Sequence, residues 1–208
     1  MKQTPIDEIY HFKCTSCGDC CSGHMEININ IYDLYKISRK SNFSSTGELF
    51  ERRLVKLVQV QNNCWTPQII FKKLPLEFCP WLINDMGDND ILKGFCSLHP
   101  TTKPLICRMA PAGRVVDFHN HQISYVLTPP TENCHGMKST QENRLSLLER
   151  DIHDELELEY RFYRILENLK KVKIPEDVML KKFYIFNTDS PFEQILAERE
   201  KMPFNLML

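Results

Sequence analysis

The stretch Cys14–Cys21, "CTSCGDCC", sets four cysteines within eight residues. Two C-x-x-C units overlap in it, Cys14/Cys17 and Cys17/Cys20, and Cys21 follows directly. A C-x-x-C turn directs two thiolates at one metal, which is why the spacing recurs in zinc and iron–sulfur sites. The alternative is that these cysteines are buried and pack as small hydrophobic residues. That explanation suits a single cysteine, but it does not suit four cysteines within eight residues. The stretch therefore predicts metal ligands.

The adjacent pair Cys20 and Cys21 adds a geometric condition. In extended backbone, neighbouring side chains point to opposite faces. Both thiolates can reach one ion only if the chain turns at this point. Otherwise Cys21 serves a second site or acts as a reactive thiol beside the first.

The remaining cysteines are Cys64, Cys79, Cys96, Cys107 and Cys134. Four of them lie in constrained settings: "FCPWL", "GFCSLHPTTKPLICRMAPAG" and "ENCHG". Prolines restrict the loop conformations, as suits ligands held in fixed positions. Cys64 has no such setting, so eight cysteines remain as candidates. They can complete two four-cysteine sites, or one cluster with spare thiols.

The composition of the 208-residue chain excludes several classes of protein. Lys+Arg 26 against Asp+Glu 27 gives a net charge of -1, so there is no global attraction to nucleic acid or anionic lipid. No apolar run approaches the roughly 20 residues that span a bilayer. The N-terminus lacks an apolar signal core. We therefore expect a cytoplasmic protein without nucleic-acid or membrane partners, and in that reducing compartment cysteines serve metal or redox chemistry rather than disulfides.

The cysteines are confined to one part of the chain, since none follows Gly136. This predicts a cysteine-cluster metal-binding domain over residues 1–138 and a helical C-terminal extension over 139–208 that packs on it. The expected class is α+β. A small metal-anchored core with short strands and helices precedes the helical extension.

Periodicity and capping signals predict the individual elements. The expected helices are Tyr32–Ser38 capped by Asn30, residues 47–60 capped by Ser45 or Thr46, a long amphipathic helix that starts at a Ser139-x-x-Glu142 capping box and runs through Leu166, and Phe192–Lys201. The expected strands are residues 65–71 and a hairpin over 114–127 that turns near Asn120, and Asn84–Asp90 is expected as a turn.

Three elements in this order, "CTSCGDCC", "CPWL" and "CSLHPTTKPLICRMAP", together resemble the YkgJ-type, or CxxCxxCC, family of zinc- or iron-chelating domains over about residues 10 to 136. His99, Lys103 and Ala110 depart from the family pattern, which puts the substrate-facing role of those positions in doubt. The resemblance implies metal ligation at Cys14, Cys17, Cys20, Cys21, Cys79, Cys96, Cys107 and Cys134. One branch is similar to flagellin lysine-N-methylases, which implies a possible role for S-adenosylmethionine.

Thiolate ligands suit both zinc and an iron–sulfur cluster. The tripled C-x-x-C spacing favours a [4Fe–4S] cluster. Arg108, beside Cys107, is a candidate cofactor-binding residue because a guanidinium offsets cluster charge or binds a carboxylate, although a surface ion pair explains it equally well. His119 and His121 are a further candidate pair on an expected strand. No glycine-rich loop of the Rossmann or P-loop type is present.

Three functions remain open from the sequence. The first is a metal- or cluster-binding protein that acts in binding or electron transfer. The second is a cluster-dependent transferase that modifies a protein side chain or small molecule, in the manner of a lysine N-methylase. The third is a structural zinc module that presents the C-terminal helices to a protein partner. An exchangeable coordination position distinguishes a catalytic metal from an all-cysteine site. The partner, protein or small molecule, is unknown.

Overall fold

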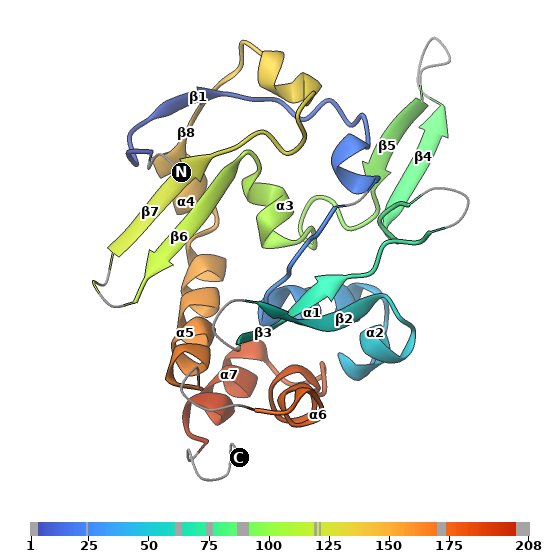
Figure 1. Ribbon diagram of the computed structural model, residues 1–208, viewed down its shortest axis with the longest axis vertical. Helices are drawn as coiled ribbons and strands as arrows, with labels where there is room; N and C mark the ends of the chain where they lie inside the picture. The colour runs from blue at the N-terminus through green and yellow to red at the C-terminus, as the bar shows by residue number, and fades with distance from the viewer. Residues whose placement is uncertain are drawn as a thin grey trace. The chain divides into compact units, whose positions relative to one another are not determined.

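The structure is a computed structural model that describes residues 4–23, 25–60, 64–73, 77–86, 92–118, 120, 122–169 and 174–202 (Figure 1). Helices and short antiparallel strands give an α+β fold, as the sequence predicts. The chain forms two compact units, each assembled from three segments. Unit 1 comprises Met1–Met25, Phe71–His99 and Ile106–His153; unit 2 comprises Glu26–Ile70, Pro100–Leu105 and Asp154–Leu208. The division predicted at residue 138 stays a prediction.

Unit 1 is built mainly from strand pairs. Its elements are β1 (Ile9–His11), η1 (Asp19–Cys21), β4 (Leu82–Met86), β5 (Leu92–Cys96), α3 (Leu105–Met109, from its second residue), β6 (Ala112–Asp117), β7 (Gln122–Leu127), η4 (His135–Lys138), β8 (Glu142–Arg144) and α4 (Leu145–Asp151). Three antiparallel pairs, β1–β8, β4–β5 and β6–β7, form separate two-stranded sheets. Such small sheets bury little apolar surface by themselves.

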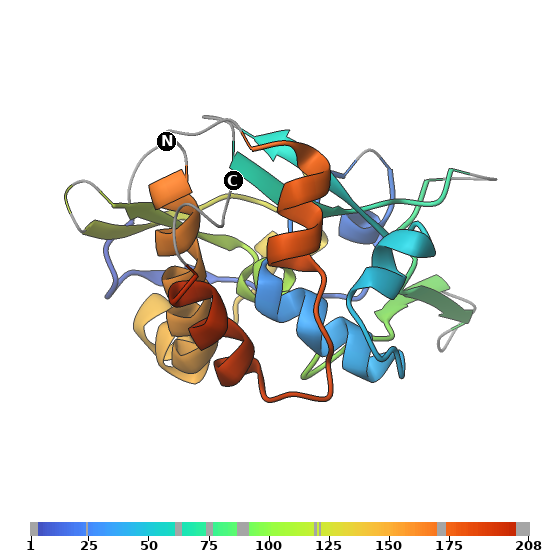
Figure 2. The same cartoon turned by 90° about the horizontal axis from the view of Figure 1, so that it is seen from below.

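Unit 2 is mainly helical. Its elements are α1 (Ile31–Lys40), α2 (Gly47–Glu51), β2 (Val55–Val60), β3 (Cys64–Ile69), α5 (His153–Leu169, from its second residue), α6 (Glu176–Met179), the π-helical turn η5 (Leu180–Tyr184) and α7 (Phe192–Glu200). Strands β2 and β3 pair antiparallel, with Val55 opposite Ile69. Figure 2 shows α1 and α7 of this unit, which meet through the rings of Tyr35 and Phe192, whose centroids lie 5.3 Å apart.

The two units bury their apolar residues unequally. In the described part of the chain, the largest fully buried side chains belong to unit 2 with the exception of Leu145. The exposed large hydrophobic side chains belong to unit 1 with the exception of Val60. Unit 2 therefore has a conventional hydrophobic core, whereas unit 1 has a thin one.

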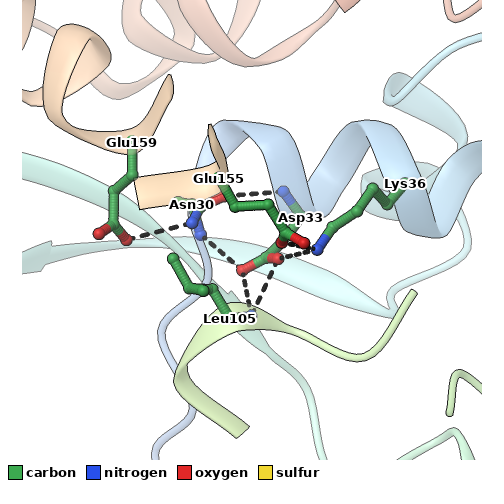
Figure 3. A network of polar contacts seen from close by, with 6 residues as sticks. All are labelled: Asn30, Asp33, Lys36, Leu105, Glu155 and Glu159. Atoms are coloured by element: carbon green, nitrogen blue, oxygen red, sulfur yellow. Dashed lines mark hydrogen bonds and ion pairs between the residues drawn. The ribbon is translucent and has the colours of Figure 1, made fainter. Parts of the chain in front are cut away.

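A buried polar network organises the start of α1 (Figure 3). Asn30 caps the helix as predicted: its side chain accepts a hydrogen bond from the Asp33 amide (2.7 Å), and the Asp33 carboxylate accepts one from the Asn30 amide (3.3 Å). The same carboxylate, 1% exposed, accepts from the Leu105 amide at 3.0 Å and lies 3.2 Å from Lys36 Nζ. Lys36 in turn contacts Glu155 at 2.6 Å. One side chain thus caps the first turns of both α1 and α3.

The helix predicted over residues 47–60 is wrong in its second half. Helix α2 ends at Glu51, Arg53 adopts a left-handed φ of 54°, and β2 follows from Val55. The stretch Val55–Val60 begins with a buried, exposed, buried alternation, which has the period of a strand. Pairing with β3 satisfies its backbone and overrides the helix propensity of the preceding residues.

The capping box predicted at Ser139 and Glu142 is also wrong. Glu142 lies in β8, where it pairs with His11 of β1, and the helix begins only at Leu145. The predicted long helix is interrupted at Ile152, whose φ of -123° is not helical, so that α4 and α5 are separate. Here, strand pairing with a segment more than a hundred residues away overrides the local capping pattern.

Other predicted elements are confirmed. Strand β3 covers most of residues 65–71, the hairpin is β6–β7, and α7 matches the predicted final helix. Asn84 to Met86 extend β4 rather than forming a turn. Residues 87–90, His119 and His121 lie outside the described residues. Among the described residues, no helix is long and apolar enough to cross a membrane.

Candidate metal centre

The chain turns at Cys20 and Cys21. Such a turn is required if the thiolates of two adjacent residues are to reach one ion. Gly18 has a left-handed φ of 81°, and its carbonyl accepts a hydrogen bond from the Cys21 amide at 2.8 Å. The turn closes as the short helix η1, and the Cys20 and Cys21 Sγ atoms lie 4.0 Å apart. A tetrahedral zinc site with Zn–S bonds of about 2.3 Å has sulfur–sulfur edges of about 3.8 Å.

Backbone pairing brings Cys79 to this turn. The Cys79 amide donates to the Cys21 carbonyl at 2.7 Å, and Ser22 forms an antiparallel bridge with Phe78. The Cys79 carbonyl accepts from the Leu82 amide at 3.0 Å, which leads the chain into β4. The C-P-W-L element and the CxxCxxCC element are thereby held side by side.

Two glycines allow η1 to lie directly on the β4–β5 hairpin, as Figure 1 shows within unit 1. A Cβ placed on Gly94 would lie 2.7 Å from the Gly18 Cα, a backbone atom that cannot yield. The Gly94 amide donates to the Ser16 carbonyl at 2.7 Å. Cys96, which pairs with Leu82 across the hairpin, is thereby held close to Cys79.

Five thiols interact with one another in this region, and we call them the inner group: Cys20, Cys21, Cys79, Cys96 and Cys107. The pKa of Cys21 is raised far above its ordinary value by the hydrogen bond with Cys20, then by burial, then by the charges of Cys20, Cys79 and Cys107. Burial also raises the pKa of Cys79 to about 11, with smaller contributions from Cys96 and Cys20. All five are half-buried. Without a cation these thiols oppose one another's ionisation.

The other three candidates, Cys14, Cys17 and Cys134, form what we call the outer group. Cys14 and Cys17 are exposed and Cys134 is half-buried. The Lys13 amide donates to the Gly136 carbonyl at 3.1 Å, and a Cβ on Gly136 would lie 2.6 Å from the Lys13 carbonyl oxygen. This close approach sets the segment before Cys14 beside the segment after Cys134.

The remaining residues of interest belong to neither group. Cys64 begins β3 in unit 2, whereas all eight predicted ligands belong to unit 1. Arg108 lies in the last turn of α3, half-buried, directly after Cys107. His99 and His135 are exposed, and His24 lies outside the described residues. None of the nine cysteines, all of them described, forms a disulfide.

The thiol donors suit a thiophilic metal, although they are not preorganised as a coordination shell. Among the described residues, no three His, Cys, Asp or Glu side chains already stand in a metal-coordinating arrangement. The inner group nonetheless supplies more thiols than the four that a zinc ion or a cubane cluster requires. Its members come from four chain segments, and backbone hydrogen bonds join the segment of Cys20 and Cys21 to those of Cys79 and Cys96.

Sequence reasoning predicted the cysteines as ligands but missed two of the glycines that hold their chain segments together. Gly18 lay inside the motif, whereas Gly94 and Gly136 carried no local signal beyond their place two residues from a cysteine. Their role depends on a backbone approach between distant segments. Comparison with protein-family models, curated proteins and solved structures finds no match for this chain.

Proposed function

We propose that this chain is a metal-binding protein that holds an iron–sulfur cluster or zinc through the thiolates of unit 1. The proposal rests on one observation: the candidate ligands lie in the unit with the thin hydrophobic core. All eight candidate ligands belong to the unit that carries the exposed large hydrophobic side chains, Val60 excepted, and Cys64 alone belongs to the well-packed unit. Units that bury too little apolar surface are commonly stabilised by a metal.

The inner group supports the proposal through its chemistry. A metal cation bound there replaces the thiol protons and offsets the mutual repulsion of the thiolates, which its absence leaves uncompensated. The charges that raise the pKa of Cys21 and of Cys79 are those of neighbouring thiols, and a bound metal cation would offset them. We further propose the reducing cytoplasm as the compartment, since thiolates persist there.

The test is anaerobic purification of the full chain, followed by a visible spectrum and analysis for iron, sulfide and zinc. A coloured protein with matching iron and sulfide favours the cluster, and a colourless protein that retains zinc favours zinc. The same preparation tests binding of S-adenosylmethionine.

Matched variants sharpen this test. The double change Cys79→Ser/Cys96→Ser removes two inner-group thiols and should lower metal content, whereas Cys64→Ser should leave it unchanged. Equal metal content in the two variants would refute the ligand assignment. A wild-type chain that contains no metal after growth with excess iron and zinc would refute the proposal itself.

A further inference from the structure

Unit 2 contains a pocket between α1, α5 and the start of α7. Its volume of about 400 Å³ lies within the range of about 300–1,000 Å³ that is usual for small-molecule sites. All of its lining residues belong to unit 2, and none of them is a candidate metal ligand. The lining combines apolar and charged side chains, among them Tyr32, Tyr35, Arg39, Leu158, Asp189 and Phe192.

The apolar part of the pocket is held in place by packing. Tyr32 and Tyr35 lie on one face of α1, and the Phe192 ring packs against both, with centroid distances of 4.8 and 5.3 Å. The side chains of Tyr35, Phe192 and Leu158 are buried. The Tyr35 hydroxyl donates to the Ser190 carbonyl at 3.2 Å, which ties α1 to the segment before α7. Aromatic rings fixed in this way favour a ligand that carries an aromatic ring.

The basic side chain of the pocket, Arg39, is positioned by its own helix. Its Nη1 donates to the Tyr35 hydroxyl at 2.9 Å, and the guanidinium carbon lies 5.6 Å from the centre of the Tyr35 ring. In the part of the chain that the structure describes, Arg39 forms no ion pair. The guanidinium has five N–H donors, so donors remain for an anionic group of a ligand.

The pocket has two acidic side chains, and they differ in their partners. Glu193 is paired with Arg161, at 2.6 Å. The Asp189 amide donates to Asn187 Oδ1 at 2.7 Å, which fixes the backbone at this position. No described residue donates a hydrogen bond to the exposed Asp189 carboxylate. The pocket therefore presents one free cation and one free anion among its described side chains, beside an aromatic wall.

From this arrangement we propose that the pocket binds a zwitterionic, amino-acid-type molecule with an aromatic side chain, either a free amino acid or a short peptide. Arg39 pairs with its carboxylate and Asp189 with its ammonium group, while its ring packs on Tyr32 and Phe192. A ligand of this kind complements both charges at once, whereas an ion of one sign is repelled by one of them. The inference goes beyond the proposed function and does not depend on a metal.

The experiment is a calorimetric titration of the full chain with L-phenylalanine and with glycyl-L-phenylalanine. Both probes carry one ammonium, one carboxylate and one phenyl ring, and the dipeptide holds its two charges farther apart. At least one of them should bind saturably, and the tighter one identifies the source. The analogues 3-phenylpropionate, which lacks the ammonium, and 2-phenylethylamine, which lacks the carboxylate, should bind about tenfold more weakly, because each loses a charged hydrogen bond.

Variants assign the two charges separately. Arg39→Gln and Asp189→Asn should each weaken binding of the zwitterion about tenfold. Arg39→Gln should leave the affinity for 2-phenylethylamine unchanged, since that analogue has no carboxylate. Lys40→Gln on the same helix and Asp177→Asn do not alter the pocket lining and are the matched controls. Arg39 and Asp189 are exposed, so urea unfolding of their variants should match that of the wild type, which separates lost binding from misfolding.

Three results would overturn the inference. One is a wild type that binds neither zwitterion. Another is equal affinity for L-phenylalanine and 2-phenylethylamine, which would mean that the carboxylate is not recognised. The third is unchanged affinity for the zwitterion in both Arg39→Gln and Asp189→Asn. Metal content is measured independently of these titrations, so failure of this inference and failure of the proposed function are distinguishable.

Discussion

Units 1 and 2 reach compactness by different means. Unit 2 buries most of the largest apolar side chains of the described chain, including Phe162, Phe183 and Tyr184. Unit 1 joins two-stranded sheets and short helical turns, and leaves Ile83, Phe95 and other apolar residues exposed. The contrast indicates that hydrophobic burial stabilises unit 2, whereas under the proposed function thiolates and a metal cross-link unit 1.

Metal removal should have the largest effect of the changes considered, and that effect should be confined to unit 1. Structural zinc contributes about 10–16 kcal/mol of apparent binding free energy in small domains, far more than one side-chain contact. After chelation, hydrogen exchange should become fast at the amides of Cys79 and Gly94, which bond to the CxxCxxCC segment. The amide of Leu34 in α1 should stay protected. Mass spectrometry of peptic fragments measures both in one sample, and equal loss of protection in the two units would contradict the expected contrast.

Within unit 2, the largest loss of stability should follow from removing the buried carboxylate of Asp33. Asp33→Ala removes the acceptor for the Asn30 and Leu105 amides and one partner of Lys36. Breaking a buried ion pair costs about 3 kcal/mol or more, and a lost cap adds to it. Urea unfolding followed by circular dichroism should register the loss. Asp189→Ala, at an exposed carboxylate, is the control and should change the free energy of unfolding little.

Gly94→Ala should destabilise unit 1 by about 2 kcal/mol, since a Cβ there meets the Gly18 backbone at 2.7 Å. It should also lower metal content because η1 must move off the hairpin that carries Cys96. Gly113→Ala is the matched control: its Cβ would meet a Val126 methyl at 3.2 Å, and a side chain can shift. Thermal unfolding and metal analysis of both variants test this. Equal effects would mean that the close approach of the two glycines is not a requirement.

These glycines also mark the limit of what the sequence predicts. Composition and periodicity are local, so they predicted the α+β class, the Asn30 cap and the β6–β7 hairpin correctly. They failed where a distant segment decides, as at Glu142, which pairs with β1 instead of capping a helix. For the candidate site, motif spacing predicted which cysteines are ligands, and that assignment stays a prediction. The division into inner and outer groups depends on backbone contacts between segments that no spacing encodes.

The smallest expected effect concerns the exposed ion pairs between α5 and α7. Arg161 contacts Glu200 at 2.8 Å and Glu193 at 2.6 Å, and the hydrogen bonds from Arg161 lower the pKa of Glu200. A carboxyl with a lowered folded-state pKa stabilises the fold above its unfolded pKa, and that contribution disappears as the pH falls through the folded pKa. Arg161→Met should therefore cost about 0.5–1 kcal/mol at neutral pH and little in acid.

Thermal unfolding at several pH values measures this difference between Arg161→Met and the wild type. Arg150→Met serves as the control, because Arg150 is 73% exposed and its contact with Asp151 spans 3.5 Å. A cost for Arg161→Met that persists unchanged in acid would mean that Arg161 acts through the packing of its aliphatic stem rather than through charge. Since both helices belong to unit 2, neither variant should alter metal content, and a change in metal content would show that the stability of unit 2 and metal binding by unit 1 are coupled.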